Sequence, residues 1–140
     1  MTYARLKSLL SGLLIGDNVM PKEDDSLLGL LQYALTTVAT KADSLHLMTL
    51  DVNSNVLRMA KGDYLIRYPE LPEDEEDHID IDEELVFAVA RYMASYMSKA
   101  KGGIHVQAAD RIIMDYNAKT YEALDQAALL DNETGDLHAV

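Results

Sequence analysis

DIDEELVFAVARYMASYMSKAKGG, residues 80–103, contains the clearest pattern of the sequence. It predicts the strongest helix of the chain, over about residues 81–101. Its apolar side chains recur at helical spacing: Leu85, Val86, Val89, Tyr92, Met93, Tyr96 and Met97. Asp80, with Glu83 three residues later, has the spacing of a capping box at the start of this helix. Gly102 and Gly103 are expected to end it.

The last helix is predicted beyond these two glycines, from about residue 105 to 128. Apolar and small residues recur there in a heptad rhythm: Val106, Ala109, Ile113, Tyr116, Thr120, Ala123 and Ala127. A short glycine turn between two such helices favours a long antiparallel pair. Residues 129–140 show no such pattern, so they are expected to form an extended C-terminal tail.

Two further helices are predicted in the first third of the chain. Residues 2–15 contain leucines at helical spacing, and Thr2 could cap the helix that they form. A second helix is expected over residues 26–42, with Ser26 or Asp25 at its N-cap. The fold class is therefore predicted as mainly α, a helical bundle of about four helices.

The period of the apolar residues changes between about residues 45 and 68, which predicts a small β-hairpin or meander inserted between the helices. Strands are expected over residues 45–50, 56–59 and 64–68, with Tyr64, Ile66 and Tyr68 alternating on one face of the last. So few short strands are marginal alone. They are expected to lean on the helices or on a neighbouring chain.

The formal net charge of the 140-residue chain is −12, and it is unevenly distributed. Residues 70–84 contain ten acids and residues 122–140 contain five, with no Lys or Arg in either segment. The rest of the chain holds all 12 basic residues. Dense like charge resists compaction, so an acidic loop over about residues 70–80 is expected to be mobile and solvated unless a partner neutralises it. The charge argues against a protein that grips nucleic acid.

No pattern in the sequence indicates catalysis. The chain has no Cys, and its four His lie outside any HExxH motif. There is no phosphate-binding glycine loop or GxSxG motif, and the acidic loop lacks the glycine of an EF-hand. We therefore expect no catalytic residue, no metal site, no cofactor and no enzyme activity. The apolar stretch 9–15 is too short to span a membrane, so no membrane partner is expected.

The order of these parts resembles the head–tail adaptor (connector, or head-completion) proteins of tailed bacteriophages. The resemblance covers roughly residues 27–125 in layout. It runs from LLGLLQYAL (27–35) through GDYLIRYPELP (62–72) and the acidic segment to IDIDEELVFAVARYMASY (79–96). It implies a single adaptor domain over residues 1–128 with a tail over 129–140. The positions that match the family's packing helix are structural rather than catalytic: Leu85, Val89, Tyr92 and Tyr96.

The resemblance implies a structural protein of the virion neck, assembled in the host cytoplasm. Its copies would form a ring, a dodecamer, that continues the DNA channel without sequence-specific DNA binding. Its partners would be the portal protein, a downstream neck or tail protein and other copies of itself. The tail would dock on the portal through a small set of residues: Leu129, Leu130, Asp131, Leu137 and Val140.

Several residues near the β insertion are candidates for contacts between subunits. The strand arginines are expected to pair with the acidic loop or the tail, within one chain or across chains. The strand tyrosines could pack on the helices or contact a neighbour. The candidates are Arg58, Arg67, Tyr64 and Tyr68, together with Glu73 and Asp74 of the acidic loop.

Two other classes of function stay open on the sequence. The acidic stretch 70–84 is compatible with an acidic regulator, or DNA mimic, that occupies a basic groove on a nucleic-acid enzyme. It is also compatible with a small metal-dependent enzyme that uses the acidic cluster.

Overall fold

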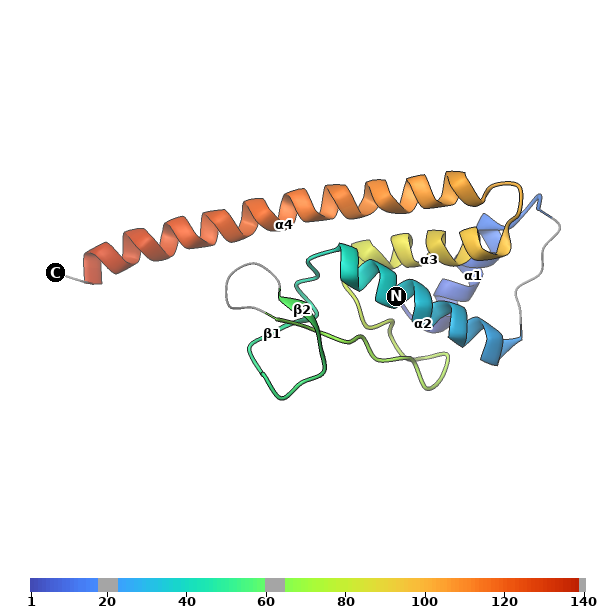
Figure 1. Ribbon diagram of the computed structural model, residues 1–140, viewed down its shortest axis with the longest axis horizontal. Helices are drawn as coiled ribbons and strands as arrows, with labels where there is room; N and C mark the ends of the chain where they lie inside the picture. Colours follow the sequence, from blue (N-terminus) through green and yellow to red (C-terminus); the bar gives the residue numbers. More distant parts are fainter. Residues whose placement is uncertain (18–22, 60–64, 139–140) are drawn as a thin grey trace.

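The structure is a computed structural model and describes residues 1–17, 23–59 and 65–138, with the backbone alone for 58–59, 121 and 123–138 (Figure 1). The described chain is mainly α with a small antiparallel sheet, which confirms the predicted fold class. The elements in order are α1 (Tyr3–Leu13), α2 (Asp24–Lys41), β1 (Met48–Thr49), β2 (Val56–Met59), β3 (Leu65–Arg67), α3 (Glu83–Met97) and α4 (Gly102–His138).

Helix α3 is the centre of the fold. It packs along α4 and also contacts α1 and α2, so the other three helices surround it (Figure 1). Nine of its side chains are buried: Leu85, Val86, Ala88, Val89, Ala90, Tyr92, Met93, Ala94 and Met97. The predicted apolar stripe is confirmed except at Tyr96, which is 37% exposed. A helix buried around most of its circumference is a core element, which is why its sequence dominates the pattern.

The predicted N-cap of the first helix is confirmed, and that of the second is wrong. The hydroxyl of Thr2 accepts a hydrogen bond from the Arg5 N–H at 3.3 Å. Helix α2 begins earlier than expected, after Glu23, whose side chain makes no capping bond. Asp25 and Ser26 therefore lie in its first turn, where an acidic side chain still suits the positive end of the helix dipole.

The turn between α3 and α4 differs from its prediction in detail. Helix α3 starts after Asp82 rather than Asp80 and ends at Met97, so the capping box is absent. The two glycines begin α4 instead of ending α3. A Cβ on Gly102 would lie 3.3 Å from the backbone oxygen of Ser95, so glycine permits the close approach of the two chain segments there. The predicted antiparallel pairing is confirmed (Figure 1).

Helix α4 follows its heptad pattern and then exceeds its predicted length. Ala109, Ile113, Tyr116 and Thr120 are buried, as the spacing predicted. The prediction of an extended tail from residue 129 is wrong, because the helix continues through His138, well past the ends of α2 and α3 (Figure 1). The run AALL over residues 127–130 consists of strong helix formers. No helix in the described part of the chain is long and apolar enough to cross a membrane.

The β insertion forms a three-stranded antiparallel sheet with the order β1-β3-β2. The hairpin of β2 and β3 is confirmed, whereas a meander is wrong, because the last strand lies in the middle and pairs with both others. The first strand is shorter than the predicted 45–50, since residues 45–47 form a turn. Ile66 of β3 is fully buried in the main core, so the sheet leans on the helices as expected.

Candidate functional site

The acidic segment 70–80 has a defined conformation, where the sequence predicted a loose loop. The N–H of Tyr3 donates to the backbone oxygen of Asp77 at 2.9 Å, and the N–H of Ile79 donates to that of Met1 at 2.9 Å. The side chain of Ile79 is only 4% exposed. The segment is thus fastened to the start of α1, and Ile79 enters the core.

Short aspartate side chains shape the tip of this segment. The Asp77 carboxylate accepts the N–H groups of Glu73 at 2.8 Å and Asp74 at 3.1 Å. The Asp74 carboxylate in turn accepts the N–H groups of Glu76 at 2.8 Å and Asp77 at 3.1 Å. Such local bonds favour turns over regular structure. Glu73, Asp74 and Glu76 consequently remain exposed on a shaped backbone, available to solvent or to a partner, whereas the exposed Glu75 forms an ion pair with Lys7.

Arg67 pairs with the acidic segment of its own chain. Its guanidinium makes a bidentate contact with Asp80, at 2.6 and 2.8 Å. The Asp80 carboxylate also accepts the Glu70 N–H at 2.7 Å and lies 2.7 Å from Nε2 of His46. The strand arginines were expected to pair with the acidic loop or the tail, within one chain or across chains. For Arg67 the pairing is with the acidic loop of its own chain. Arg58 lies in β2, and its side chain is outside the described part of the structure.

The environment of Asp80 makes stability depend on pH. Burial alone would raise the pKa of this carboxyl, but hydrogen bonds from Arg67, the Glu70 N–H and His46 lower it from 3.8 to about 2. Because the folded pKa is depressed, its stabilisation is complete above about pH 5 and is lost as the pH falls from about 4 to about 2. The contribution at neutral pH is about 2 kcal/mol.

We expect Arg67→Ala to remove the largest share of this stabilisation, about 1 to 2 kcal/mol near pH 6 and much less near pH 2.5, because Asp80 is then largely protonated in the unfolded chain. Urea unfolding of wild type and variant at both pH values measures the difference. Arg5→Ala, a substitution of an exposed arginine, is the control and should change little at either pH. An Arg67→Ala penalty equal at both pH values contradicts the assignment.

A second polar cluster joins the β insertion to α3 and α4. The Asp82 carboxylate accepts hydrogen bonds from the Ser44 hydroxyl, from the His46 N–H at 3.1 Å and from the Tyr116 hydroxyl at 2.6 Å. The Tyr116 oxygen accepts the Leu45 N–H at 2.9 Å. Burial and the bond to Asp82 raise the pKa of Tyr116 to about 12, so this phenol stays protonated and donating. This cluster is structural, since each group is satisfied by another.

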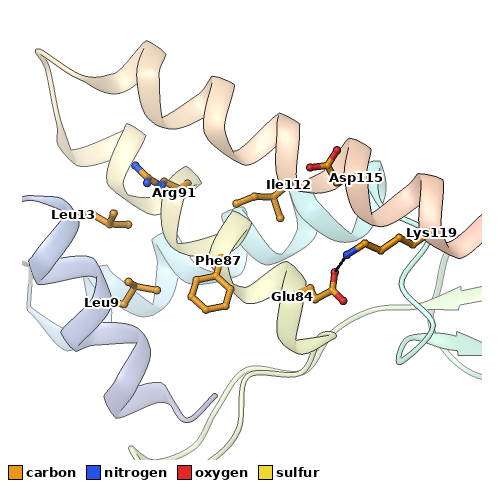
Figure 2. Close-up of a pocket in the computed structure, with 8 residues that line it drawn as sticks. All are labelled: Leu9, Leu13, Glu84, Phe87, Arg91, Ile112, Asp115 and Lys119. Atoms are coloured by element: carbon orange, nitrogen blue, oxygen red, sulfur yellow. Dashed lines mark hydrogen bonds and ion pairs between the residues drawn. The ribbon is translucent and has the colours of Figure 1, made fainter.

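A groove of about 490 Å³ lies between α1 and α4, with α3 as its floor (Figure 2). Its apolar lining includes Phe87, which is 45% exposed, and Lys119 closes one end through an ion pair with Glu84 at 3.3 Å. No pattern in the sequence predicted this groove. The only signal was a single Phe outside the apolar stripe. The lining consists of Leu9, Leu13, Phe87 and Ile112, with Glu84, Arg91, Asp115 and Lys119 at the margins.

The remaining predicted residues are dispersed. Tyr68 follows β3 and is 47% exposed, so it is available to a neighbour. Tyr64 and Val140 lie outside the described residues. The backbone of the portal-docking candidates belongs to the end of α4: Leu129, Leu130, Asp131 and Leu137. Within the described ranges, no group of three or more His, Asp or Glu is placed to hold a metal ion.

Fold and surface together define a small, mainly α protein with an ordered acidic segment, an apolar groove and a protruding terminal helix. Comparison of the chain with protein-family models, curated proteins and solved structures found no match. A functional proposal therefore rests on the residues, their geometry and the resemblance in layout.

Proposed function

We propose that the chain is a head–tail adaptor of a tailed bacteriophage, a structural virion protein without enzyme activity. Its copies form a ring, a dodecamer, between the portal and a downstream neck or tail protein. The observation that carries the proposal is the combination of a compact body around α3 with a helix, α4, that continues beyond it (Figure 1). A small protein that joins two larger assemblies needs one rigid body and one segment that reaches outward.

The end of α4 is the proposed portal-docking segment. Residues 129–138 are helical, and the described core residues of α4 end at Thr120. An isolated helix gains little stability in water, because most helical stability comes from packing. Docking on a portal would supply that packing for Leu129, Leu130 and Leu137, which are apolar, with Asp131 and Val140 completing the contact.

The acidic segment suits a protein that surrounds DNA without binding it. Glu73, Asp74, Glu75 and Glu76 are exposed, and a surface rich in carboxylates repels phosphate. Such a surface at the lumen lets DNA pass without sequence-specific contact. In this proposal the protein acts in the virion neck and assembles in the host cytoplasm.

The same segment supports one alternative, an acidic regulator that occupies a basic groove on a nucleic-acid enzyme. The observation that supports this alternative is the ordered array of exposed carboxylates, because a DNA mimic needs charges on a fixed backbone. Replacing residues 73–76 by their amide counterparts should abolish binding in that case. The adaptor proposal expects the same variant still to bind the portal.

Imaging and mass measurement of the full chain, alone and with the portal protein of the same phage, test the adaptor proposal. We expect annular particles seated on the portal. Truncation after residue 122 should leave the body folded and reduce portal binding at least tenfold, because the docking end is removed. A chain that stays monomeric and never binds the portal overturns the proposal.

A further inference from the structure

Two exposed surfaces of unlike shape flank α3. One is the groove between α1 and α4, lined by Phe87. The other, the Tyr33 face, is the exposed side of α2 near α4 and includes Tyr33, Thr36 and Thr40. In Figure 2 the residues that line the groove lie in front of α3, and α2 passes behind it.

Tyr33 is a preorganised protruding side chain. It is 66% exposed, yet its ring meets Tyr96 edge to face at 5.4 Å between centroids. Tyr96 stacks on Tyr92 at 6.5 Å, and the Tyr92 hydroxyl accepts a hydrogen bond from Lys41 at 2.7 Å. An aromatic side chain held in place loses little conformational entropy on binding, which is why tyrosine is frequent in interfaces.

Gly29 makes a gap beside this ring. It lies one turn before Tyr33 on the same exposed side of α2, and a Cβ there would meet nothing within 4 Å. Glycine inside a helix destabilises it, and no packing within the described chain calls for one at this position. A gap of this kind admits a side chain from outside.

We propose that the groove of one copy receives the Tyr33 face of a second copy. This inference rests on the proposed function and names the surfaces that join neighbours in the ring. An antiparallel approach of α2 to the neighbour's α3 brings Tyr33 onto Phe87 over the apolar floor. Arg91 lies one turn after Phe87, so its long side chain then meets the gap at Gly29.

Charge favours the same register. Asp25, an exposed residue one further turn from Gly29, brings a carboxylate toward the neighbour's Arg91. Within its own chain, Arg91 contacts Nδ1 of His105 at 3.1 Å, and no described carboxylate lies within ion-pair distance of it. An acid supplied by a second copy would therefore complete the groove.

The contact is heterologous, because it uses two different surfaces of one chain. Every copy offers both a groove and a Tyr33 face, so each copy can join two neighbours. Such head-to-tail contacts produce a closed ring when the rotation between copies closes. A contact of the groove with a second groove would instead stop at a dimer.

The absence of Cys from the chain makes a disulfide test direct. The full-length double variant Tyr33→Cys/Phe87→Cys should give a ladder of covalent oligomers on mild oxidation. The two single variants, mixed in equal amounts, should give dimers only, since each copy then has one thiol. Tyr33→Cys paired with Met114→Cys, a 70% exposed position on α4, is the matched control and should stay monomeric on denaturing gels.

The outcomes separate this inference from the proposed function. If wild type forms rings but residues 33 and 87 do not cross-link, the interface is wrong and the adaptor proposal stands. If Phe87→Cys alone cross-links, a symmetric dimer replaces the proposed contact and overturns it. If wild type forms no ring even on the portal, both proposals fail.

Gly29→Gln separates a role of this position in the interface from an effect on the stability of the chain. Glutamine is a better helix former than glycine, so the variant should raise the thermal unfolding midpoint. Its side chain also fills the gap that the neighbour's Arg91 would enter. We expect at least a fivefold loss of the 33–87 cross-link in this background. Undiminished cross-linking in the stabilised variant contradicts the proposed register.

Discussion

Replacement of Asp82 by alanine is expected to lower the free energy of unfolding by about 3 kcal/mol. The carboxylate accepts hydrogen bonds from Ser44, from the His46 N–H and from Tyr116. Ser44 is 0% exposed and Tyr116 is 6% exposed, so water cannot easily replace the lost acceptor. Each buried donor without a partner carries a desolvation penalty. Urea unfolding followed by circular dichroism measures the change.

Glu76→Ala is the matched control for this variant. Glu76 is an exposed acid of the acidic segment that precedes Asp82, so its removal should alter stability by no more than about 0.5 kcal/mol. A change of that small size for Asp82→Ala as well would show that the cluster around Asp82 does not hold the β insertion to the helices. Asp82→Asn, which keeps one carbonyl oxygen, should fall between wild type and the alanine variant.

Replacement of Ile66 by alanine is expected to destabilise the protein by about 3 kcal/mol. Ile66 is 0% exposed and belongs to the central strand, which pairs with both other strands of the sheet. Truncation removes apolar contacts and leaves a cavity where the sheet meets the helices. Chemical unfolding of the purified variant gives the magnitude.

Val52→Ala tests whether the effect of Ile66 comes from burial. Val52 belongs to the same insertion but is 77% exposed, so its truncation should change stability by less than about 0.5 kcal/mol. Equal effects at the two positions would mean that the sheet does not contribute to the main core.

The helices were predictable because their buried sides repeat within one element. The spacing from Leu85 to Met97 reports the burial of α3 directly. The start of α3 was not predictable in the same way. Asp80 has the spacing of a capping residue, but Arg67 offers it a bidentate, charge-assisted contact from outside the helix. Local spacing contains no information about that competing partner.

Two other differences have separate physical causes. The end of the chain lacks a clear apolar pattern, yet α4 continues to His138, and the strong helix formers of residues 127–130 favour that continuation over its first turn. The order of the strands differs because chain neighbours usually pair, whereas here the last strand lies between the first two. The groove could not be predicted at all. It exists only where α1, α3 and α4 meet, and no single segment contains its pattern.

Because α4 is long, a small change in its tilt displaces its far end by a larger distance. Its 37 residues extend for about 55 Å, and the buried residues of its described part end at Thr120. The part of α4 beyond Thr120 extends for about 27 Å, so a tilt of about 10° at that point would move the far end by about 5 Å. Small adjustments in the packing of Ile113 or Tyr116 against α3 would be magnified into large changes in where the terminus points. The buried residues that stabilise the body thus also determine the direction in which the end of α4 points.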